Sequence, residues 1–357
     1  MTVVAAIDTQ ALQHNLALVK TLAPQAKVLA MVKANAYGHG LVQVANALAD
    51  ADAVAAARLD EALALREAYP ERRVVVLSEY CSSDLLQQCA SYAFDLVLHQ
   101  IEDVAAFCRE HLPVAINIWL KLDTGMHRLG LPCSDAEKVH QVIKQITDNR
   151  NARELVLMSH FASAEADYTN TEGQIRRFAE LTNEINCERS LANSAAIMRW
   201  PASHVDWVRP GIMLYGASPF INDKTNSDLQ PVMTLTAPVI AVNHIKAGER
   251  VGYNGIWQAQ RDSSIGTVGI GYGDGYPRHA RNGTPVLLNG VRAPMVGRVS
   301  MDMITVDLTD HPRYAVGDSV VLWGKDLLAN EVASFADTIA YDLFTSVSKR
   351  VNFCYET

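Results

Sequence analysis

The strongest constraint on the fold is a regular alternation of short apolar segments and amphipathic helices between about residue 25 and residue 215. Such segments, rich in Val, Ile and Leu, are typical of buried strands. They cover residues 27–33, 53–57, 74–78, 95–99, 116–123 and 155–160 and, less clearly, 187–193 and 205–209. Strands that alternate with helices pair in parallel through helical crossovers. Eight such units in about 200 residues predict a TIM-type (β/α)8 barrel, and an open doubly wound sheet is the alternative.

The helices between these strands show their own start signals. Amphipathic segments cover residues 60–68, 101–110 and 134–147. A Ser or Thr followed three residues later by Glu or Gln is typical of a capping box at a helix start. We therefore expect Ser134 with Glu137, and Thr171 with Gln174, to open two helices.

The pattern changes after about residue 230. Strand-like segments at 238–243, 265–271, 285–288, 304–308 and 319–323 follow one another with only one expected helix, at 331–338. Asn289-Gly290 between two of them is a strong hairpin signal. We predict an α/β chain in which a barrel over residues 1–230 is followed by a mostly antiparallel β domain over residues 231–357. Residues 1–8 form a strand that can join the second domain.

Composition excludes several classes of function. The 357 residues are 49% hydrophobic with a net charge of -8, so no basic field favours nucleic acid or anionic lipid. No apolar segment approaches the ~20 residues that span a membrane, and the first residues lack the basic flank of a signal peptide. The six cysteines form no C-x-x-C pair and no metal-ligand cluster. We expect reduced thiols in a cytoplasmic protein without a bound metal.

Catalytic groups of a barrel lie where its strands end. Lys33 ends the first apolar segment. A desolvated lysine loses its proton more easily and can form a Schiff base with an aldehyde. The alternative is a lysine whose ammonium group reaches solvent at the barrel rim.

The fifth and sixth segments also end in polar side chains. Lys121 and Asp123 alternate onto one face, where a structural ion pair is the simplest interpretation. Arg128 could bind a substrate carboxylate through two parallel hydrogen bonds. His160 is either structural or placed to stack on a planar cofactor.

The loops after the seventh and eighth segments are the usual phosphate site of such a barrel. The Ser194 hydroxyl and the backbone amides of Gly211 and Ile212 suit that role. In the second domain, the glycines around Tyr272 do not make a dinucleotide site, because Pro277 follows where a helix should begin.

Taken together, these motifs resemble the alanine racemase family over nearly the whole chain. The matching segments are residues 32–40 (Val-Lys-Ala-Asn-Ala-Tyr-Gly-His-Gly), 121–130, 206–211, 251–253, 271–275 and 301–303. The resemblance implies a pyridoxal-phosphate enzyme that interconverts L-alanine and D-alanine through an external aldimine, with Lys33 and Tyr253 as the two bases. It also implies a role in D-alanine supply for peptidoglycan or in alanine catabolism.

The resemblance further implies a homodimer whose sites combine one chain's barrel with the other chain's β domain. The implied cofactor-binding residues are Lys33, Tyr37, His160, Ser194, Arg209, Gly211, Ile212 and Tyr341. The substrate carboxylate would be held by Arg128 and the Met301 backbone amide, with Lys121 carbamylated to fix Arg128. The residues implied at the entrance are Tyr272, Arg278, Arg298 and Ile339.

One departure concerns Ser190, which stands where many relatives carry a histidine, so we expect Arg209 to lack one supporting partner. Two other functions remain open. A basic amino-acid decarboxylase or a broad-specificity racemase could use this architecture, but Arg209 at the pyridine nitrogen and the bulk of Tyr253, Tyr341 and Met301 favour a racemase with a small pocket. A non-catalytic pyridoxal-phosphate carrier would resemble the barrel alone.

Overall fold

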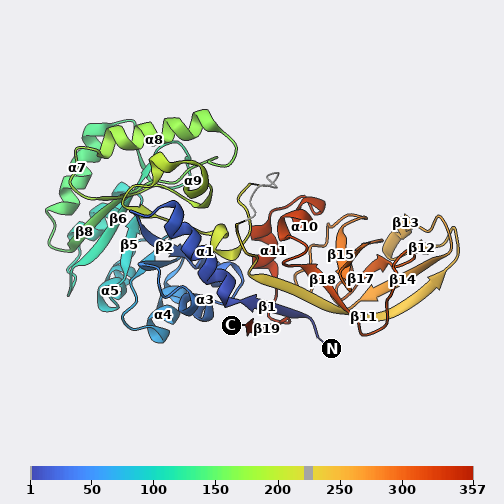
Figure 1. Cartoon of the computed structure of the whole chain (residues 1–357). Coiled ribbons are helices and arrows are strands. Elements are labelled where there is room, and N and C mark those ends of the chain that lie inside the picture. The colour runs from blue at the N-terminus through green and yellow to red at the C-terminus, as the bar shows by residue number, and fades with distance from the viewer. Residues whose placement is uncertain (1, 221–227, 357) are drawn as a thin grey trace. The chain divides into compact units, whose positions relative to one another are not determined.

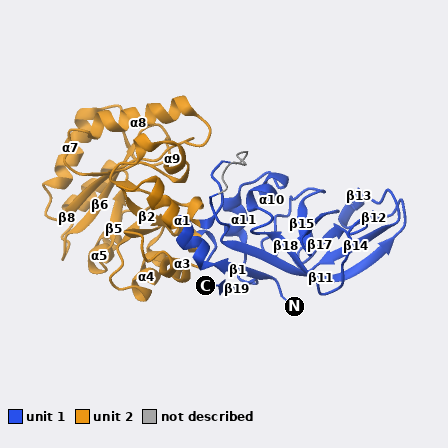
Figure 2. Ribbon diagram, viewed as in Figure 1, with its two compact units in different colours: residues 1–15, 37–39, 215–357 blue, residues 16–36, 40–214 orange. Residues whose placement is uncertain are grey.

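The computed structural model describes residues 2–220 and 228–356. The chain divides into two compact units, shown in different colours in Figure 2. Unit 1 comprises residues 1–15, 37–39 and 215–357, and unit 2 comprises residues 16–36 and 40–214. Each unit is described by itself below. Within the described residues, no helix is long and apolar enough to cross a membrane.

Unit 2 is a closed parallel barrel. Its strands are β2 (Lys27–Met31), β3 (Ala53–Ala56), β4 (Val74–Val76), β5 (Asp95–Leu98), β6 (Ile116–Asp123), β8 (Ala152–Met158), β9 (Glu188–Ser190) and β10 (Trp207–Val208). Each pairs in parallel with its neighbour, and the pairings β5–β6 and β10–β2 close the ring. The short strand β7 (Leu131–Pro132) adds to the end of β6. The predicted (β/α)8 barrel is confirmed, and the open sheet is excluded because no edge is left.

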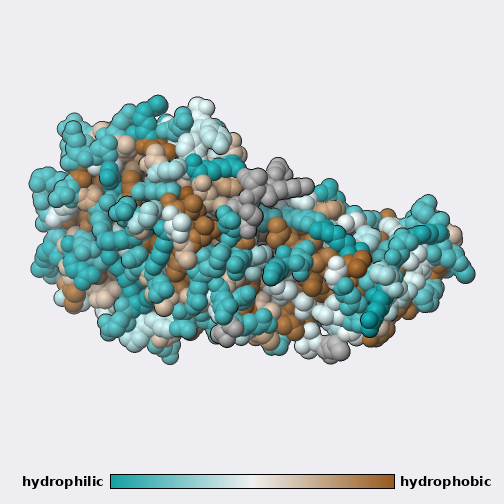
Figure 3. Space-filling model, in the orientation of Figure 1, coloured by the Kyte–Doolittle hydropathy of each residue, from teal (hydrophilic) through white to brown (hydrophobic). Residues whose placement is uncertain are grey.

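Helices surround these strands, as Figure 1 shows. They are α3 (Leu41–Ala47), α4 (Leu59–Ala68), α5 (Ser83–Ser91), α6 (Ile101–Arg109), α7 (Ala136–Thr147), α8 (Tyr168–Thr182) and α9 (Ser194–Arg199). Helix α7 buries Val139, Val142, Ile143 and Ile146 at helical spacing. On the face drawn in Figure 3, the surface over α7 and α8 is mostly hydrophilic.

Two expected capping boxes are wrong. The side chain of Asp135, not of Ser134, accepts the hydrogen bond from the third backbone N–H of α7. Helix α8 begins earlier than expected, capped by Asp167, so Thr171 and Gln174 lie inside it and are buried. In both cases an aspartate is the N-cap, one residue after Ser134 and four residues before Thr171, and Asp is at least as favourable there as Ser or Thr.

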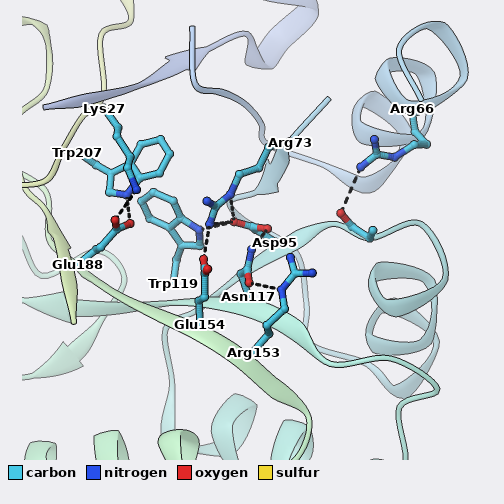
Figure 4. A network of polar contacts seen from close by, with 11 residues as sticks. Lys27, Arg66, Arg73, Asp95, Asn117, Trp119, Arg153, Glu154, Glu188 and Trp207 are labelled. Atoms are coloured by element: carbon cyan, nitrogen blue, oxygen red, sulfur yellow. Dashed lines mark hydrogen bonds and ion pairs between the residues drawn. The ribbon is translucent and has the colours of Figure 1, made fainter. Parts of the chain in front are cut away.

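The amino-terminal end of the barrel is closed by a polar network (Figure 4). Asp95, 2% exposed, accepts hydrogen bonds from Asn117 Nδ2 and Trp119 Nε1, both at 2.9 Å, and pairs with Arg73 at 2.8 Å. Arg73 also reaches Glu154 at 3.4 Å. A buried carboxylate is tolerated because every partner is present, and these partners come from neighbouring strands.

The network yields a stability prediction. Asp95→Ala should lower the free energy of unfolding by about 3–5 kcal/mol, because it leaves Arg73 without its buried counter-ion and two donors without acceptors. Asp148→Ala is the control, because Asp148 pairs with Lys144 on the exposed face of α7 and its loss should cost at most about 1 kcal/mol. Urea-induced unfolding measures both. Equal losses in the two variants would contradict the prediction.

Unit 1 is built on the long strand β11 (Met233–Ile245). It pairs antiparallel with β1 (Val4–Asp8), β14 (Ser263–Val268) and β18 (Ser319–Trp323). The remaining strands are β12 (Arg250–Val251), β13 (Trp257–Gln258), β15 (Pro285–Leu288), β16 (Val291–Pro294), β17 (Ile304–Asp307) and β19 (Asn352–Glu356). Only β1 and β19 pair in parallel within this unit's described strands. The mostly antiparallel second sheet is confirmed.

The hairpin between β15 and β16 forms as predicted. Leu288 pairs with Val291, and the two turn residues Asn289 and Gly290 have φ angles of 49° and 77°. Positive φ at both positions is what a type I′ turn requires, and Asn-Gly supplies it with little strain. Unit 1 also contains α10 (Ala329–Phe335), near the expected helix, and α11 (Ala340–Ser346), which the sequence pattern did not reveal.

Two helices link the units along the chain. Helix α1 (Thr9–Leu22) begins in unit 1 and ends in unit 2, and the segment α2 (Lys33–Tyr37) begins in unit 2 and ends in unit 1. The second of these carries the lysine at the end of the first barrel strand.

Candidate active site

Lys33 lies just beyond the end of β2, before a left-handed turn. Residues 34–37 have φ angles between 52° and 54°. For residues other than glycine, this conformation costs roughly 1–2 kcal/mol each and persists only when the surroundings enforce it. Four such residues in a row mark a segment whose backbone is fixed by its neighbours.

Asn35 and Glu61 provide that support. One carboxylate oxygen of Glu61 accepts the Asn35 N–H at 2.9 Å, and the other accepts the Ala57 N–H at 3.1 Å. The side chain of Asn35 accepts the Leu41 N–H at 2.9 Å, at the start of α3. The turn is therefore tied to β3, α3 and α4. Sequence analysis did not single out Glu61 or Asn35, because their partners are backbone amides.

The Lys33 amine is an unusually weak base. Burial lowers its pKa, the positive charges of Arg128 and Arg209 lower it further, and Glu61 opposes them. A larger neutral fraction makes the amine a better nucleophile towards an aldehyde.

Lys121 shows the same effect. Burial, followed by Arg209, Arg128 and Lys33, lowers the pKa of Lys121 to about 8. Among the described residues, no salt bridge joins it to Asp123. The Asp123 carboxylate instead accepts the backbone N–H groups of residues 125–127, each at 3.0 Å. The ion pair is therefore absent, and Asp123 orders the turn that leads to the exposed Arg128.

Arg209 follows the end of β10, and several hydrogen bonds fix its guanidinium group. Its Nη1 donates to Ser190 Oγ at 2.7 Å, and its Nη2 donates to the carbonyls of Ser159 and Leu191. The expectation that Ser190 leaves Arg209 short of a partner is wrong, because the serine hydroxyl on the adjacent strand β9 accepts this hydrogen bond. Burial lowers the pKa of Arg209 to about 10, so it stays charged at neutral pH.

His160 is neutral. Its Nδ1 lies 3.3 Å from Arg209 Nη2, which can only donate, so Nδ1 accepts and the ring proton is on Nε2. Burial, with the positive charge of Arg209 second, lowers its pKa well below the usual range. A neutral ring that receives a fixed hydrogen bond suits stacking rather than acid catalysis.

The residues expected to hold a phosphate fall into two groups, one in each unit. In unit 2, Ser194 is the first residue of α9, its Oγ accepts the Gly211 N–H at 2.9 Å, and Ile212 follows directly. In unit 1, Tyr37 stacks on Tyr215 with ring centroids 4.7 Å apart and lies near Tyr341 at 5.8 Å. Burial, then Tyr341, raises the pKa of Tyr37, which keeps its hydroxyl protonated as a donor.

Unit 1 also places the second predicted base. Tyr253 is 68% exposed, in a tight turn after Gly252, whose φ is 72°. Arg298 approaches this turn, its backbone nitrogen lying 3.5 Å from where a Cβ of Gly252 would be. Ile339 is the N-cap residue of α11 and is exposed.

A second loop pair in unit 1 presents Met301 and Tyr272. The N–H of Gly273 donates to the Met301 carbonyl at 2.8 Å, and the N–H of Tyr272 donates to Ser300 at 3.0 Å. Arg278 lies over the Tyr272 ring, 5.9 Å from its centroid. Met301 itself is exposed. These hydrogen bonds bring two loops of unit 1 together, a pairing that the sequence pattern did not reveal.

The charges at the mouth of the barrel indicate what it binds. Lys33, Lys121 and Arg209 lie together with Arg128, and the pKa of each lysine is lowered first by burial and then by the neighbouring cations. Bound anions would balance the positive charge of such a site. A weakly basic amine, a neutral imidazole and the Ser194 hydroxyl beside the Gly211 amide lie on one barrel. This combination suits a planar, phosphorylated aldehyde, the chemistry of a barrel-type pyridoxal-phosphate enzyme.

Comparisons with known proteins give the family. Residues 7–219 match the model of the alanine racemase N-terminal domain, and residues 232–355 match that of the C-terminal domain. The alanine racemase of Aeromonas hydrophila is 48% identical over 351 residues, which is 98% of both chains, and that of Photobacterium profundum is 46% identical over 356 residues, again 98% of each.

Comparison with solved structures indicates the same family. The biosynthetic alanine racemase of Pseudomonas aeruginosa superposes with a TM-score of 0.95 at 44% identity, covering 100% of this chain and 99% of that one. The alanine racemase of Bartonella henselae, with covalently bound pyridoxal phosphate, has a TM-score of 0.89 at 29% identity, with full coverage of both chains. The chain belongs to the alanine racemase family, and the resemblance noted in the sequence is confirmed.

Proposed function

We propose that this racemase binds pyridoxal phosphate through Lys33 and that Lys33 and Tyr253 exchange protons with opposite faces of the substrate Cα. The reaction is the interconversion of L-alanine and D-alanine, as in the relatives named above. The cofactor withdraws electrons from Cα and so acidifies its proton. The observation that carries the proposal is the lowered pKa of Lys33 among cations at the end of the first barrel strand.

Arg209 and His160 orient the cofactor ring in this proposal. Because Arg209 keeps its proton, it can donate to the pyridine nitrogen but does not protonate it. The ring then draws less charge from Cα, which limits side reactions such as transamination. His160, fixed by Arg209, packs against the ring. Arginine here argues against a decarboxylase, which would need an acidic residue.

The phosphate is assigned to the hydroxyl of Ser194 and the amides of Gly211 and Ile212, with Tyr37 and Tyr341 as further donors. The two groups are also close along the chain, because three residues separate Lys33 from Tyr37 and two residues separate Ile212 from Tyr215.

The substrate carboxylate is assigned to Arg128 and the backbone amide of Met301, and the entrance residues are Tyr272, Arg278, Arg298 and Ile339. Tyr253, Tyr341 and Met301 would leave room for a small side chain only. A pyridoxal-phosphate carrier is disfavoured, because residues 232–355, which make up most of unit 1, match the C-terminal family domain.

We further propose a cytoplasmic homodimer in which Tyr253 serves the Lys33 of the partner chain. Each site of a two-fold dimer can be built from both chains. The exposure of Tyr253 in the single chain supports this, since a catalytic base should be enclosed when it works. All six cysteines are free, which supports a reducing compartment.

The first test concerns the covalent site. The purified protein should be yellow, and borohydride should fix the cofactor irreversibly to the peptide that contains Lys33. Peptide mass mapping locates the label. A label on Lys121, the other low-pKa lysine, would show that the assignment is wrong.

The second test concerns carbamylation of Lys121. A pKa of about 8 leaves about a tenth of the amine neutral at pH 7 and about half at pH 8. The neutral amine adds to CO2 and releases a proton, so the carbamate should increase as the pH rises through this range. It should be visible by NMR with ¹³C-labelled carbonate. Lys121→Ala should lose the signal, and Lys144→Ala, a change on the exposed face of α7, should retain it. An identical spectrum for Lys121→Ala would leave Lys121 as an unmodified amine.

The third test concerns the shared site. Lys33→Ala and Tyr253→Phe should each be inactive alone. Random exchange makes about half the dimers mixed, each with one intact site, so activity should return to about a quarter of that of the wild type. Mass-tagged chains confirm the exchange. If mixed dimers form but remain inactive, Tyr253 acts within its own chain.

A further inference from the structure

The side chain of Gln174, on α8, is fully buried and joins the loops after two barrel strands. Its Nε2 donates to the His160 carbonyl at 3.0 Å and to Thr124 Oγ1 at 3.1 Å. Its Oε1 accepts the Ala162 N–H at 2.9 Å. Both donors and the acceptor of the amide are therefore used, and none of the partners belongs to α8.

The hydroxyl groups of Thr124 and Ser159 extend this network, and the donor in each of their hydrogen bonds can be assigned. Ser159 Oγ donates its single proton to the Leu122 carbonyl at 2.7 Å. Thr124 Oγ1, 2.8 Å away, must therefore donate to Ser159 Oγ, which leaves Thr124 as the acceptor of the Gln174 amide. Ser159 in turn accepts Arg209 Nη2 at its carbonyl. The network thus runs from Gln174 to the backbone that holds Arg209.

Arg177, on the next turn of α8, holds the same loop by its backbone. Its Nε donates to the Thr124 carbonyl at 2.7 Å, and a Cβ at Gly125 would lie 2.8 Å from its Nη2. Helix α8 therefore fixes both the side chain and the main chain of Thr124. The turn capped by Asp123 then leads directly to Arg128.

We propose that Gln174 is a positioning residue that sets His160 and the Arg128 loop in their working positions. The inference rests on the roles proposed above for these two residues. The Gln174 side chain connects the loop after β6 to the loop after β8. It thereby keeps the His160 ring and the Arg128 guanidinium in a fixed position relative to each other. Because Arg128 is assigned to the carboxylate, the effect should appear mainly in substrate binding.

The test compares two buried side-chain amides, Gln174, which binds the loop after β8, and Asn151, which precedes β8. Asn151 precedes the strand, donates to the carbonyls of Phe107 and Glu110 at 2.8 and 2.9 Å, and accepts the Leu112 N–H. Gln174→Met and Asn151→Leu thus remove matched sets of hydrogen bonds with similar volume. Both should lower the Tm. Only Gln174→Met should raise the KM for alanine and the inhibition constant of acetate, each about tenfold, with kcat changed less than threefold.

A second variant keeps the proposal testable if Gln174→Met does not fold. In Gln174→Glu, a protonated carboxyl can still donate one hydrogen bond and accept the Ala162 N–H, whereas a carboxylate cannot donate. Burial raises the pKa of such a carboxyl. The KM of this variant, relative to that of the wild type at the same pH, should therefore fall as the pH is lowered.

Three outcomes distinguish the possibilities. Wild-type KM and acetate inhibition in Gln174→Met, or no pH dependence of relative KM in Gln174→Glu, would overturn the proposal. An equal rise in KM for Asn151→Leu would show that the effect is only loss of stability. Arg128→Ala is the reference: if it leaves acetate inhibition unchanged, the assignment of Arg128 fails, independently of Gln174.

Discussion

Repulsion among cations at the mouth of the barrel is the interaction on which the proposed site depends. Parallel strands that close into a ring bring all their carboxyl ends together, so Lys33, Lys121 and Arg209 are neighbours although they are far apart in the sequence. Taking these groups out of water weakens the two lysines as bases, while the arginine stays charged. Burial, reinforced by this repulsion, thus makes the amines better nucleophiles and leaves a positive field that, in the proposed site, a phosphate and a carboxylate would relieve.

The two ends of the barrel differ in how far their buried charges are compensated by other protein groups. At the amino-terminal end, Asp95 meets Arg73, Asn117 and Trp119, and its charge is compensated within the protein (Figure 4). At the carboxyl end, cations outnumber the acids that face them, since Glu61 and Asp123 are engaged with backbone amides. Full compensation stabilises a fold, whereas an uncompensated field binds a ligand at some cost in stability.

Much of this could be predicted from the sequence, for physical reasons that particular residues show. The eight strands were found because runs such as Val74–Val76 are β-branched and bounded by turns. Helix starts were less predictable, because Asp135 and Asp167 compete with the nearby Ser134 and Thr171 for the same role. The Ser190 contact could not be predicted, since it depends on the distance between neighbouring strands. Gln174 was misread as part of a cap because its partners, Thr124 and His160, meet it only after the barrel has closed.

The backbone of the motif around Lys33 is held by contacts that particular residues make. Asn35 is among the residues that best tolerate a left-handed conformation, and its side chain secures the start of α3. Gly38 is required because a Cβ there would lie 2.0 Å from the Phe344 carbonyl oxygen. A segment held in this way has one backbone conformation, and in the proposed mechanism the Lys33 amine serves one face of the substrate Cα. In the proposed mechanism an inverting enzyme must therefore take its second proton carrier from elsewhere, and the exposed Tyr253 on a separate unit meets that requirement.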